Sequence, residues 1–494
     1  MMNGRLLGII FLGILISLRA PAQQKKPGLL NIEPLPDAVT GRTVTHTRYI
    51  PSPDSGFIVV RNITVTGNKK TRTPIILREL GIQPGDSLYR DNLRGFLEEK
   101  RQQILNTSLF LTVEVRLEHP EAPESDLTVS VTERWYLFPF PVFSLADRNF
   151  NVWWVEQHHR LDRINYGVHL HQYNLTGRND NLTLTVQNGY THSYGLTYDL
   201  PYFDKQLKQG LGLRLLYDQS REVNFVTDSN KQEYLKADHF VKKEFVAGIY
   251  YTYKKAIRLK HQLSLNYHYL SADDSVLQLN PVFFPEARSP QQFLELSYKF
   301  SYIGADSWAY PLKGFNLFAT LTRRGFGLFG GHIGETELQL NTAEYLNPYP
   351  KTYLSFGLRG RVQTPSRQPY FIRRSGMGYY EDYLRGLEYY VADADYYGIF
   401  KTNLKREVLA FRVRSRLLPR QFSTIPVRIY VKTYADLGYA HNNMPGNSVL
   451  NNRLLYTWGV GLDIVTFYDL RFRIEYSFNQ LGEKGLFLHT KSEL

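Results

Sequence analysis

Side chains that could carry out chemistry are few in this 494-residue sequence, and their spacing does not build a reaction centre. His158 and His159 are adjacent, and neighbours in an extended strand face opposite ways, so their rings do not converge on one metal ion. His169 and His171 share a face, but no carboxylate stands at a convincing spacing from them. The chain has no cysteine, and we find no glycine-rich phosphate loop and no serine elbow. We therefore expect a protein that is not an enzyme and holds no metal or cofactor.

The charged and aromatic stretch "EDYLRGLEYY", residues 381–390, lies between two segments with a clean alternating pattern. An enclosed guanidinium such as that of Arg385 needs a carboxylate with bidentate geometry, which lysine cannot copy. Gly386 permits a backbone conformation that is barred to other residues. Taken alone, the stretch favours an exposed loop arginine with no partner at position 385, so the role of Arg385 depends on the elements around it.

From Trp135 onward the sequence is a series of segments of about ten residues in which apolar and polar side chains alternate, as in transmembrane barrel strands. "LRFRIEYSF" sets four apolar residues on one face and Arg471, Arg473, Glu475 and Ser477 on the other. In lipid every backbone polar group must be paired, so such strands have to close on themselves. The pattern predicts strands near 137–145, 163–174, 181–190, 194–202, 210–220, 243–254, 259–271, 292–302, 314–324, 334–346, 352–364, 400–413, 427–440, 455–467, 469–478 and 485–490.

About sixteen strands is an even number, as bacterial outer-membrane barrels require. The connections mostly alternate between short turns, such as 255–258 and 347–351, and long loops, such as 221–242 and 365–399. A secreted β-sandwich or propeller also consists of short alternating strands. Charges that recur at alternate positions of apolar strands, together with the loop rhythm, favour the barrel. We expect residues 135–494 to form a 16-stranded antiparallel transmembrane β-barrel in a mainly β protein.

The N-terminal segment has the pattern of an export signal. Arg5 precedes an apolar run, and Ala20-Pro21-Ala22 is a small-x-small cleavage site, which predicts a signal peptide over residues 1–22. Its removal takes away two arginines and lowers the formal net charge from +13 to +11 (13 − 2). Such a basic balance suits nucleic acid or an anionic lipid surface, and export favours the lipid. Residues 23–56 contain several prolines and are expected to be a linker.

Residues 57–134 form a separate unit. "FIVVRNITVTGN" predicts a strand, "TPIILRELGI" and the passage "LYRDNLRGFLEEKRQQILNTSLF" (88–110) predict helices, and "FLTVEVRLEH" and "DLTVSVTER" predict two further strands. The order β-α-α-β-β, with "ILNTSLFLTVEV" joining the second helix to the second strand, resembles a polypeptide-transport-associated (POTRA) domain. Another small α+β module is the alternative.

One POTRA-like unit followed by such a barrel resembles the BamA/TamA superfamily of outer-membrane assembly and transport proteins, also described as the bacterial surface antigen family. Four passages carry the resemblance: "SYGLTYDLPYFD" (193–204), "DSWAYPLKGF" (306–315), "YADLGYA" (434–440) and "YLRGLEYY" (383–390). The second passage resembles a periplasmic turn in which Asp306, Pro311 and Gly314 are the motif residues. The last resembles the tip of the sixth outer loop.

The resemblance implies that the tip formed by Leu384, Arg385, Gly386 and Leu387 folds back into the barrel lumen. Arg385 would then contact acidic residues of the following strands, with Asp436 the clearest partner and Glu407 a second. Leu387 departs from the family pattern, which has an aromatic residue at this position.

The two ends of the barrel sequence are unusual. Pro139 and Pro141 remove two hydrogen-bond donors from the first strand, and proline belongs at sheet edges. The last strand, which includes Leu486 and Phe487, is short. The seam between them is either a lateral gate, where a client strand adds by β-augmentation, or an ordinary junction with its prolines at the periplasmic rim.

The resemblance implies an outer-membrane protein of Gram-negative type that takes part in inserting or translocating polypeptides, with its POTRA domain in the periplasm. Expected partners are outer-membrane lipid and lipopolysaccharide, unfolded or secreted polypeptide clients bound by the POTRA domain, and periplasmic or lipoprotein accessory factors. Nucleic acid is not expected, and the barrel is expected to be a monomer. The alternatives are a pore for a dedicated secreted partner and a POTRA scaffold around a barrel that transports nothing.

Overall fold

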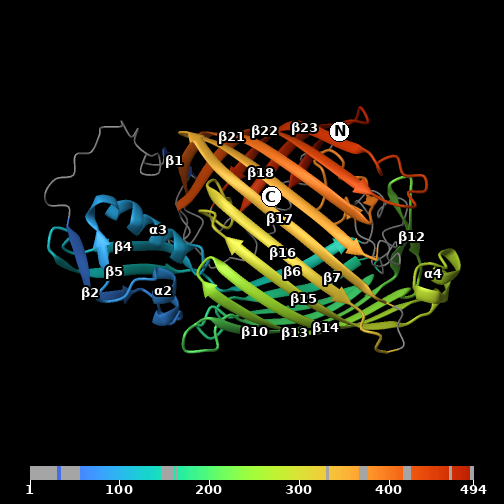
Figure 1. Ribbon diagram of the computed structural model, residues 1–494, viewed down its shortest axis with the longest axis horizontal. Coiled ribbons are helices and arrows are strands. Elements are labelled where there is room, and N and C mark those ends of the chain that lie inside the picture. Colours follow the sequence, from blue (N-terminus) through green and yellow to red (C-terminus); the bar gives the residue numbers. More distant parts are fainter. Residues whose placement is uncertain are drawn as a thin grey trace, which may run out of the picture.

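The computed structural model describes residues 30–34, 56–145, 161, 164–329, 333–365, 376–415, 424–466 and 470–489. The predicted signal peptide, and His158 and His159, lie outside these residues. Figure 1 shows a barrel of tilted strands with a small α+β domain at one end. We call that end of the barrel the POTRA end and the opposite one the distal end.

The small domain has the predicted order of elements. Its strands are β2 (Phe57–Thr66), β3 (Ser87–Tyr89), β4 (Phe110–Leu117) and β5 (Glu124–Glu133), and its helices are α2 (Thr73–Leu80), η2 (Arg90–Asn92) and α3 (Leu93–Leu105). The sheet order is β3-β2-β5-β4, with β2 and β5 parallel. Helix α2 has a proline in its first turn and ends at Gly81, whose left-handed φ of 62° suits glycine. Only the short strand β3 is an addition to the predicted pattern.

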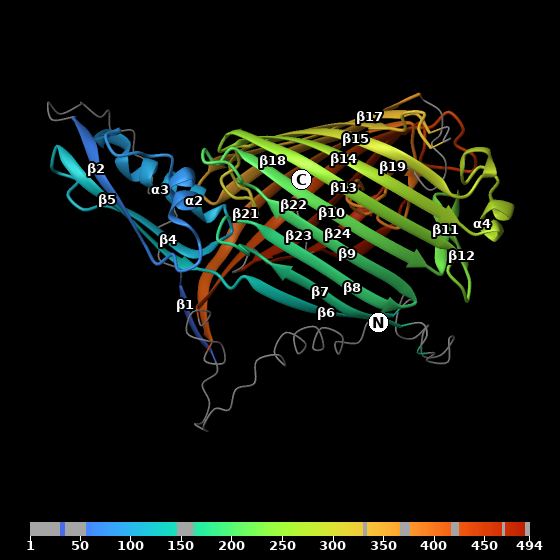
Figure 2. The same ribbon diagram turned by 90° about the horizontal axis from the view of Figure 1, so that it is seen from below.

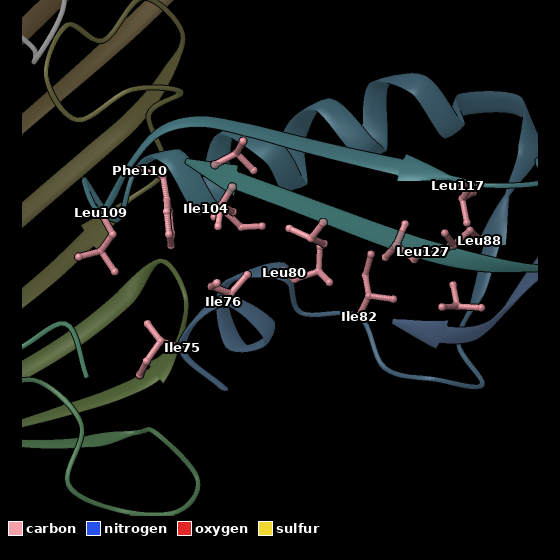
Figure 3. Close-up of a cluster of buried hydrophobic side chains, with 14 of the residues drawn as sticks. Ile75, Ile76, Leu80, Ile82, Leu88, Ile104, Leu109, Phe110, Leu117 and Leu127 are labelled. Carbon is pink, nitrogen blue, oxygen red and sulfur yellow. The ribbon is translucent and has the colours of Figure 1, made fainter. Parts of the chain in front are cut away.

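The core of this domain consists of apolar side chains from α2, α3 and the inner face of the sheet, including Ile76, Leu80, Ile104 and Leu127 (Figure 3). Ile75 lies at the end of the cluster nearest the barrel strands. The cluster continues into the barrel, because Tyr202 and the half-buried Leu207 of a barrel turn belong to it. The small domain is therefore packed against the barrel through its own core.

The predicted barrel is confirmed, in a seventeen-stranded sheet made of β1 and sixteen barrel strands. The barrel strands are β6 (Leu137–Leu145), β7 (Ile164–Gln172), β8 (Asn181–Gly189), β9 (Thr191–Leu200), β10 (Gln209–Ser220), β13 (Lys242–Ala256), β14 (Leu259–Ala272), β15 (Gln291–Ile303), β16 (Gly314–Arg324), β17 (Glu335–Tyr349), β18 (Thr352–Thr364), β21 (Tyr396–Ser415), β22 (Thr424–His441), β23 (Leu454–Val465), β24 (Arg471–Asn479) and β25 (Lys484–His489). Each pairs antiparallel with the next, and β25 lies beside β6 in the sheet order.

Alternation along the strands separates an apolar outer surface from a polar interior. On β24, Phe472 and Tyr476 are 43% and 37% exposed, whereas Glu475 and Ser477 are fully buried. An apolar outer face and a polar inner face are what a barrel in lipid requires. No helix in the described part of the chain is both long and apolar enough to cross a bilayer.

Several elements were not predicted. At the distal end, β11 (Glu222–Asp228) and β12 (Lys231–Lys236) form a hairpin, and α4 (Asp274–Leu279), η5 (Pro285–Ala287), β19 (Gly376–Met377) and β20 (Ala392–Asp393) lie in the long loops. Strand β1 (Leu30–Pro34) lies within the predicted linker and pairs with the end of β21. An unpaired edge of β21 is available to these five residues, which explains a strand inside the predicted linker.

Candidate functional site

The long loop between β18 and β21 carries Arg385 into the barrel interior, where its guanidinium group pairs with the carboxylate of Asp436 on β22. The two side chains are 1% and 0% exposed. Arg385 Nε donates to Asp436 Oδ2 at 2.9 Å, and its Nη2 donates to Oδ1 of the same carboxylate. The backbone N–H of Arg385 also donates to Oδ2, at 3.1 Å. This is the bidentate geometry that only arginine provides.

The remaining guanidinium donors are also bound. Nη1 donates to the side-chain oxygen of Asn403, and Nη2 donates to the carbonyl oxygen of Thr402 at 3.0 Å. The ring of Tyr434 lies beneath the guanidinium, with 3.9 Å between Cζ and the ring centroid. Arg385 is therefore enclosed by β21 and β22, and its loop is attached to both strands.

The residues next to Arg385 in the chain contribute through backbone conformation and packing. Gly386 has a φ of 92°, and a Cβ there would lie 2.9 Å from that of Ser477, so both conformation and space require glycine. Leu384 fills the space above Gly438, where a Cβ would meet a Leu384 methyl group at 2.8 Å. Leu387 is buried in the same apolar cluster as Leu384 and Met377. Leucine thus supplies the packing for which an aromatic residue was expected.

Glu407 does not lie where an ion pair with Arg385 was expected. It is four residues beyond Asn403 along β21, and a rise of about 3.3 Å per residue places it roughly 13 Å nearer the POTRA end. There its carboxylate accepts from the hydroxyl of Tyr430 at 3.2 Å. The expectation for Glu407 is corrected: Asn403 occupies the position beside Arg385.

The same loop is attached to the last two strands. Asn479 of β24 donates from Nδ2 to the carbonyl oxygen of Gly386 at 2.8 Å. His489 of β25 lies between Glu388 of the loop, at 3.5 Å, and Glu475 of β24, at 3.2 Å. The loop therefore spans the inside of the barrel wall from β21 to β25.

An ion network that we did not predict lies next to Arg385 in the interior. Lys432 Nζ contacts Asp463 Oδ1 at 2.8 Å and Glu475 Oε1 at 2.5 Å, and all three side chains are buried. Lys405 lies 3.1 Å from the other oxygen of Asp463. The alternating charges of β24 were visible in the sequence, but their partners depend on the register of β21 to β24.

The turn between β15 and β16 reaches this network from the POTRA end. The Asp306 carboxylate accepts from the backbone N–H groups of Leu312 and Lys313, at 2.9 and 3.1 Å. Gly314 has a φ of 102°, and a Cβ there would lie 2.4 Å from a backbone oxygen. Asp306 and Gly314 hold a turn in which Pro311 follows Tyr310, and the Tyr310 hydroxyl donates to Asp463 at 2.7 Å. The predicted turn motif thus positions Tyr310, which was not among the predicted motif residues.

The POTRA domain docks on the barrel around Tyr202, which belongs to the "PYF" turn after β9. The Tyr202 ring is buried between two cations, with Arg78 of α2 at 4.7 Å and Lys254 of β13 at 4.5 Å from its centroid. Lys254 Nζ donates to the Tyr202 hydroxyl at 2.6 Å, and this hydroxyl donates to Glu79 at 3.3 Å. Burial raises the pKa of Tyr202 far above its usual range. These contacts join α2, β9 and β13 into one unit.

A second docking contact lies at the start of β6. The Tyr136 hydroxyl hydrogen-bonds to Thr71, whose hydroxyl also accepts from Asn174 at 2.9 Å. Burial raises the pKa of Tyr136 to about 12. Burial alone would raise the pKa of Glu133, but N–H groups of Thr71 and Lys70 donate to its carboxylate and the net shift is downward. The domain is thus held at two places on the POTRA end.

We expect Tyr202→Ala to undock the POTRA domain, because removing a buried aromatic ring costs about 3–5 kcal/mol. Tyr202→Phe keeps the ring and loses only the hydroxyl, so it should cost about 1–3 kcal/mol. Limited proteolysis of the purified protein measures the effect as release of an intact POTRA fragment. Equal protease resistance of Tyr202→Ala and the unaltered protein would contradict the docking role.

The seam between the first and last barrel strands differs from the other junctions. β6 pairs with β7 along its whole length, and this ladder includes Pro139 and Pro141. Residues two apart in an antiparallel strand direct their N–H groups to the same neighbour, so one side of β6 lacks two donors. β25, which includes Leu486 and Phe487, pairs with β24. It is the hydrogen-bonded neighbour of β6 in the sheet order, so the first and last barrel strands close the barrel.

The histidines near the start of the barrel stay apart from this site. His169 and His171 lie on β7, and His171 Nδ1 is 3.3 Å from the hydroxyl of Thr183 on β8. Among the described residues, no group of three or more His, Asp or Glu side chains is arranged to hold a metal ion.

Comparison with known proteins identifies the small domain. Residues 58–134 match the POTRA family model, described as a surface antigen variable number repeat. No curated protein is similar enough to the chain to count as a match.

Three solved structures are similar in overall arrangement. BamA from Haemophilus ducreyi lacking POTRA domains 1–3 is 15% identical, with 88% of this chain and 83% of that chain covered and a TM-score of 0.47. CdiB from Acinetobacter baumannii is 13% identical, with 88% and 73% covered and a TM-score of 0.46. CdiB from Escherichia coli is 10% identical, with 92% of both chains covered and a TM-score of 0.48.

Proposed function

We propose that this POTRA–barrel protein inserts polypeptides into, or translocates them across, the outer membrane, with the β6–β25 seam as the exit. The observation that carries the proposal is the seam itself: β25 has only six residues, and Pro139 and Pro141 remove two hydrogen-bond donors from one side of β6. A seam held by few hydrogen bonds separates at lower cost than the other junctions, and each strand edge it exposes can accept a client strand by β-augmentation. The apolar exterior places an opened seam in lipid, where an unpaired backbone group is costly and an added strand is favoured.

Two further features support this proposal. The POTRA domain is docked at the end of the barrel where β6 begins, so a client held by its sheet edge lies close to the seam. The loop that carries Arg385 contacts β24 and β25, so the β25 side of the seam is held in place from inside the barrel. The proposed location is the outer membrane of a Gram-negative cell, with the POTRA domain in the periplasm. Lipid, lipopolysaccharide and accessory factors are the proposed partners besides the client.

Purified protein in liposomes tests the function. An urea-unfolded barrel protein is diluted onto the vesicles, and its folding is followed by the gel shift of the folded form. We expect faster insertion than into empty vesicles or vesicles that hold an unrelated barrel of similar size. An equal rate in all three would refute insertion.

A pore for a dedicated secreted partner is the alternative function, and the contacts at the distal end of the barrel bear on whether such a pore stands open. Asn230, at the tip of the β11–β12 hairpin, is buried and donates from Nδ2 to the carbonyl oxygen of Val391 and to Ser448 Oγ, both at 2.8 Å. Its side-chain oxygen accepts from the N–H of Val449 at 2.7 Å. The hairpin thus ties the Arg385 loop to the loop between β22 and β23, across the distal end.

We expect Asn230→Ala to increase ion conductance through the barrel. Loss of these buried hydrogen bonds costs about 1–3 kcal/mol, which raises the open population roughly tenfold. Single-channel recording in planar bilayers measures this population. Ser229→Ala, at an exposed neighbouring residue, is the control and should leave conductance low. A large, stable open state of the unaltered protein would favour the pore.

A further inference from the structure

β21 and β22 continue beyond the barrel wall at the POTRA end. The ladder of β18 with β21 ends at Thr352 and Arg406, and that of β23 with β22 ends at Val465 and Arg428. β21 and β22 nevertheless stay paired as far as Arg414 and Thr424. We call residues 409–415 and 424–427 the β21–β22 ribbon. Both of its edges lie beyond the neighbouring barrel strands.

A β-bulge marks the start of the ribbon. The N–H of Glu407 donates to the carbonyl oxygen of Lys351 at 2.9 Å, and this is the last backbone bond to the β17–β18 turn. A bulge in the β21–β22 register follows between Glu407 and Leu409. Bulges bend a strand and increase its twist, so this one separates the ribbon from the regular ladder of the wall.

The β21 edge of the ribbon is occupied by strand β1 of the same chain. β1 runs antiparallel to β21, from Leu30 opposite Ser415 to Pro34 opposite Phe411. Figures 1 and 2 both show β1 beside the end of β21 that faces the POTRA domain. An extended segment from far away in the sequence thus adds a strand to this edge, which shows that the edge accepts one.

Apolar and basic side chains alternate along the β21 edge of the ribbon, and this pattern favours one kind of partner strand. Phe411 and Val413 are half-buried, whereas Arg412 and Arg414 are exposed. The register sets Ile32 opposite Val413 and Glu33 opposite Arg412. Cross-strand pairs of matching polarity or opposite charge contribute roughly 0.2–1 kcal/mol each. The edge therefore suits an extended segment in which apolar and acidic residues alternate.

We propose that the β21–β22 ribbon is a strand-docking site for extended polypeptide with alternating apolar and acidic residues, and that residues 30–34 are its resident occupant. This inference rests on the proposed function, because the segment that displaces the occupant is a client on its way to the seam. A tethered occupant acts like a ligand at roughly millimolar concentration. Residues 30–34 therefore compete successfully with segments that bind the ribbon weakly. A client that binds the ribbon more tightly displaces them.

The test uses the full-length protein in detergent and a fluorescent synthetic peptide with the sequence of residues 28–36. We expect the peptide to bind a variant that lacks residues 30–34 about tenfold more tightly than the intact protein, since the competitor is gone. A peptide with proline in place of Ile32 is the control and should not bind. Arg412→Glu with Arg414→Glu, in the shortened protein, should weaken binding. Equal affinity for the shortened and intact proteins overturns the proposal.

A cross-link gives a second measurement, because the chain contains no cysteine of its own. Cysteines at Ile32 and Val413 occupy directly opposed positions, whose Cα separation in an antiparallel pair suits a disulfide. We expect the oxidised double variant to exclude the peptide and the reduced one to admit it. Failure of the bond to form overturns the proposal. Neither measurement requires insertion activity, so a protein that binds the peptide yet inserts nothing refutes the proposed function alone.

Discussion

Arg385→Met should lower the free energy of unfolding of the barrel by about 3–5 kcal/mol, since it leaves the Asp436 carboxylate buried without its cation. Asp436→Arg should be at least as damaging, because it opposes two buried guanidinium groups. Semi-native gels in detergent measure the effect as the temperature at which the compact form converts to the unfolded one. Heat-modifiability equal to that of the unaltered protein would contradict the account of this loop.

The double variant Arg385→Met, Asp436→Leu separates the ion pair from simple packing. Removing both charges leaves no buried ion, so the double variant should be more stable than Arg385→Met alone. Arg385→Lys keeps the charge but loses the fork that reaches Asp436, Asn403 and the Thr402 carbonyl, and it should fall between Arg385→Met and the unaltered protein. Strictly additive losses in the double variant would show that the two side chains do not act together.

Lys432→Met should cost a similar amount, about 3–5 kcal/mol, because two buried carboxylates lose a shared cation. Asp463 keeps Lys405 and the Tyr310 hydroxyl, and Glu475 keeps His489, so some compensation remains. Urea unfolding in detergent, followed by tryptophan fluorescence, measures the loss. Lys243→Met removes an exposed lysine of β13 and is the matched control. A loss no larger than that of the control would mean that the network does not hold the strands together.

Local alternation was sufficient to predict the barrel, because each strand carries its own period-two pattern. Strands β6, β16 and β18 begin and end at the residues that the pattern predicted. The interior contacts depend on register between strands that are far apart in the sequence. Lys432 meets Glu475 only because β22, β23 and β24 are aligned in one way, and no short window of the sequence contains that alignment. Glu407 was misplaced for the same reason: it has the right charge on the right strand, four residues from the position that faces Arg385.

Other elements that were not predicted are short segments whose structure depends on contacts with distant parts of the chain. β1 has five residues and contains a proline, so its propensity is weak and only the free edge of β21 makes it a strand. The β11–β12 hairpin lies in a loop that was identified by its length alone, and the contacts of Asn230 come from two other loops. Leu387 was identified correctly as a departure from the family pattern, which has an aromatic residue there. The leucine side chain is nevertheless buried in the apolar cluster.

A seam that can be locked and released tests the central claim most directly. Cysteine pairs are introduced with one member at positions 138–142 of β6 and the other at 485–488 of β25, and pairs that close on oxidation are taken forward. A disulfide between Val168→Cys and Val186→Cys, directly opposed on β7 and β8, is the matched control. Each protein is placed in liposomes and the insertion of an unfolded barrel is measured before and after reduction. We predict that the seam-locked protein loses insertion and regains it on reduction, while the β7–β8 control is active in both states. Full activity of the oxidised, seam-locked protein would contradict the lateral exit.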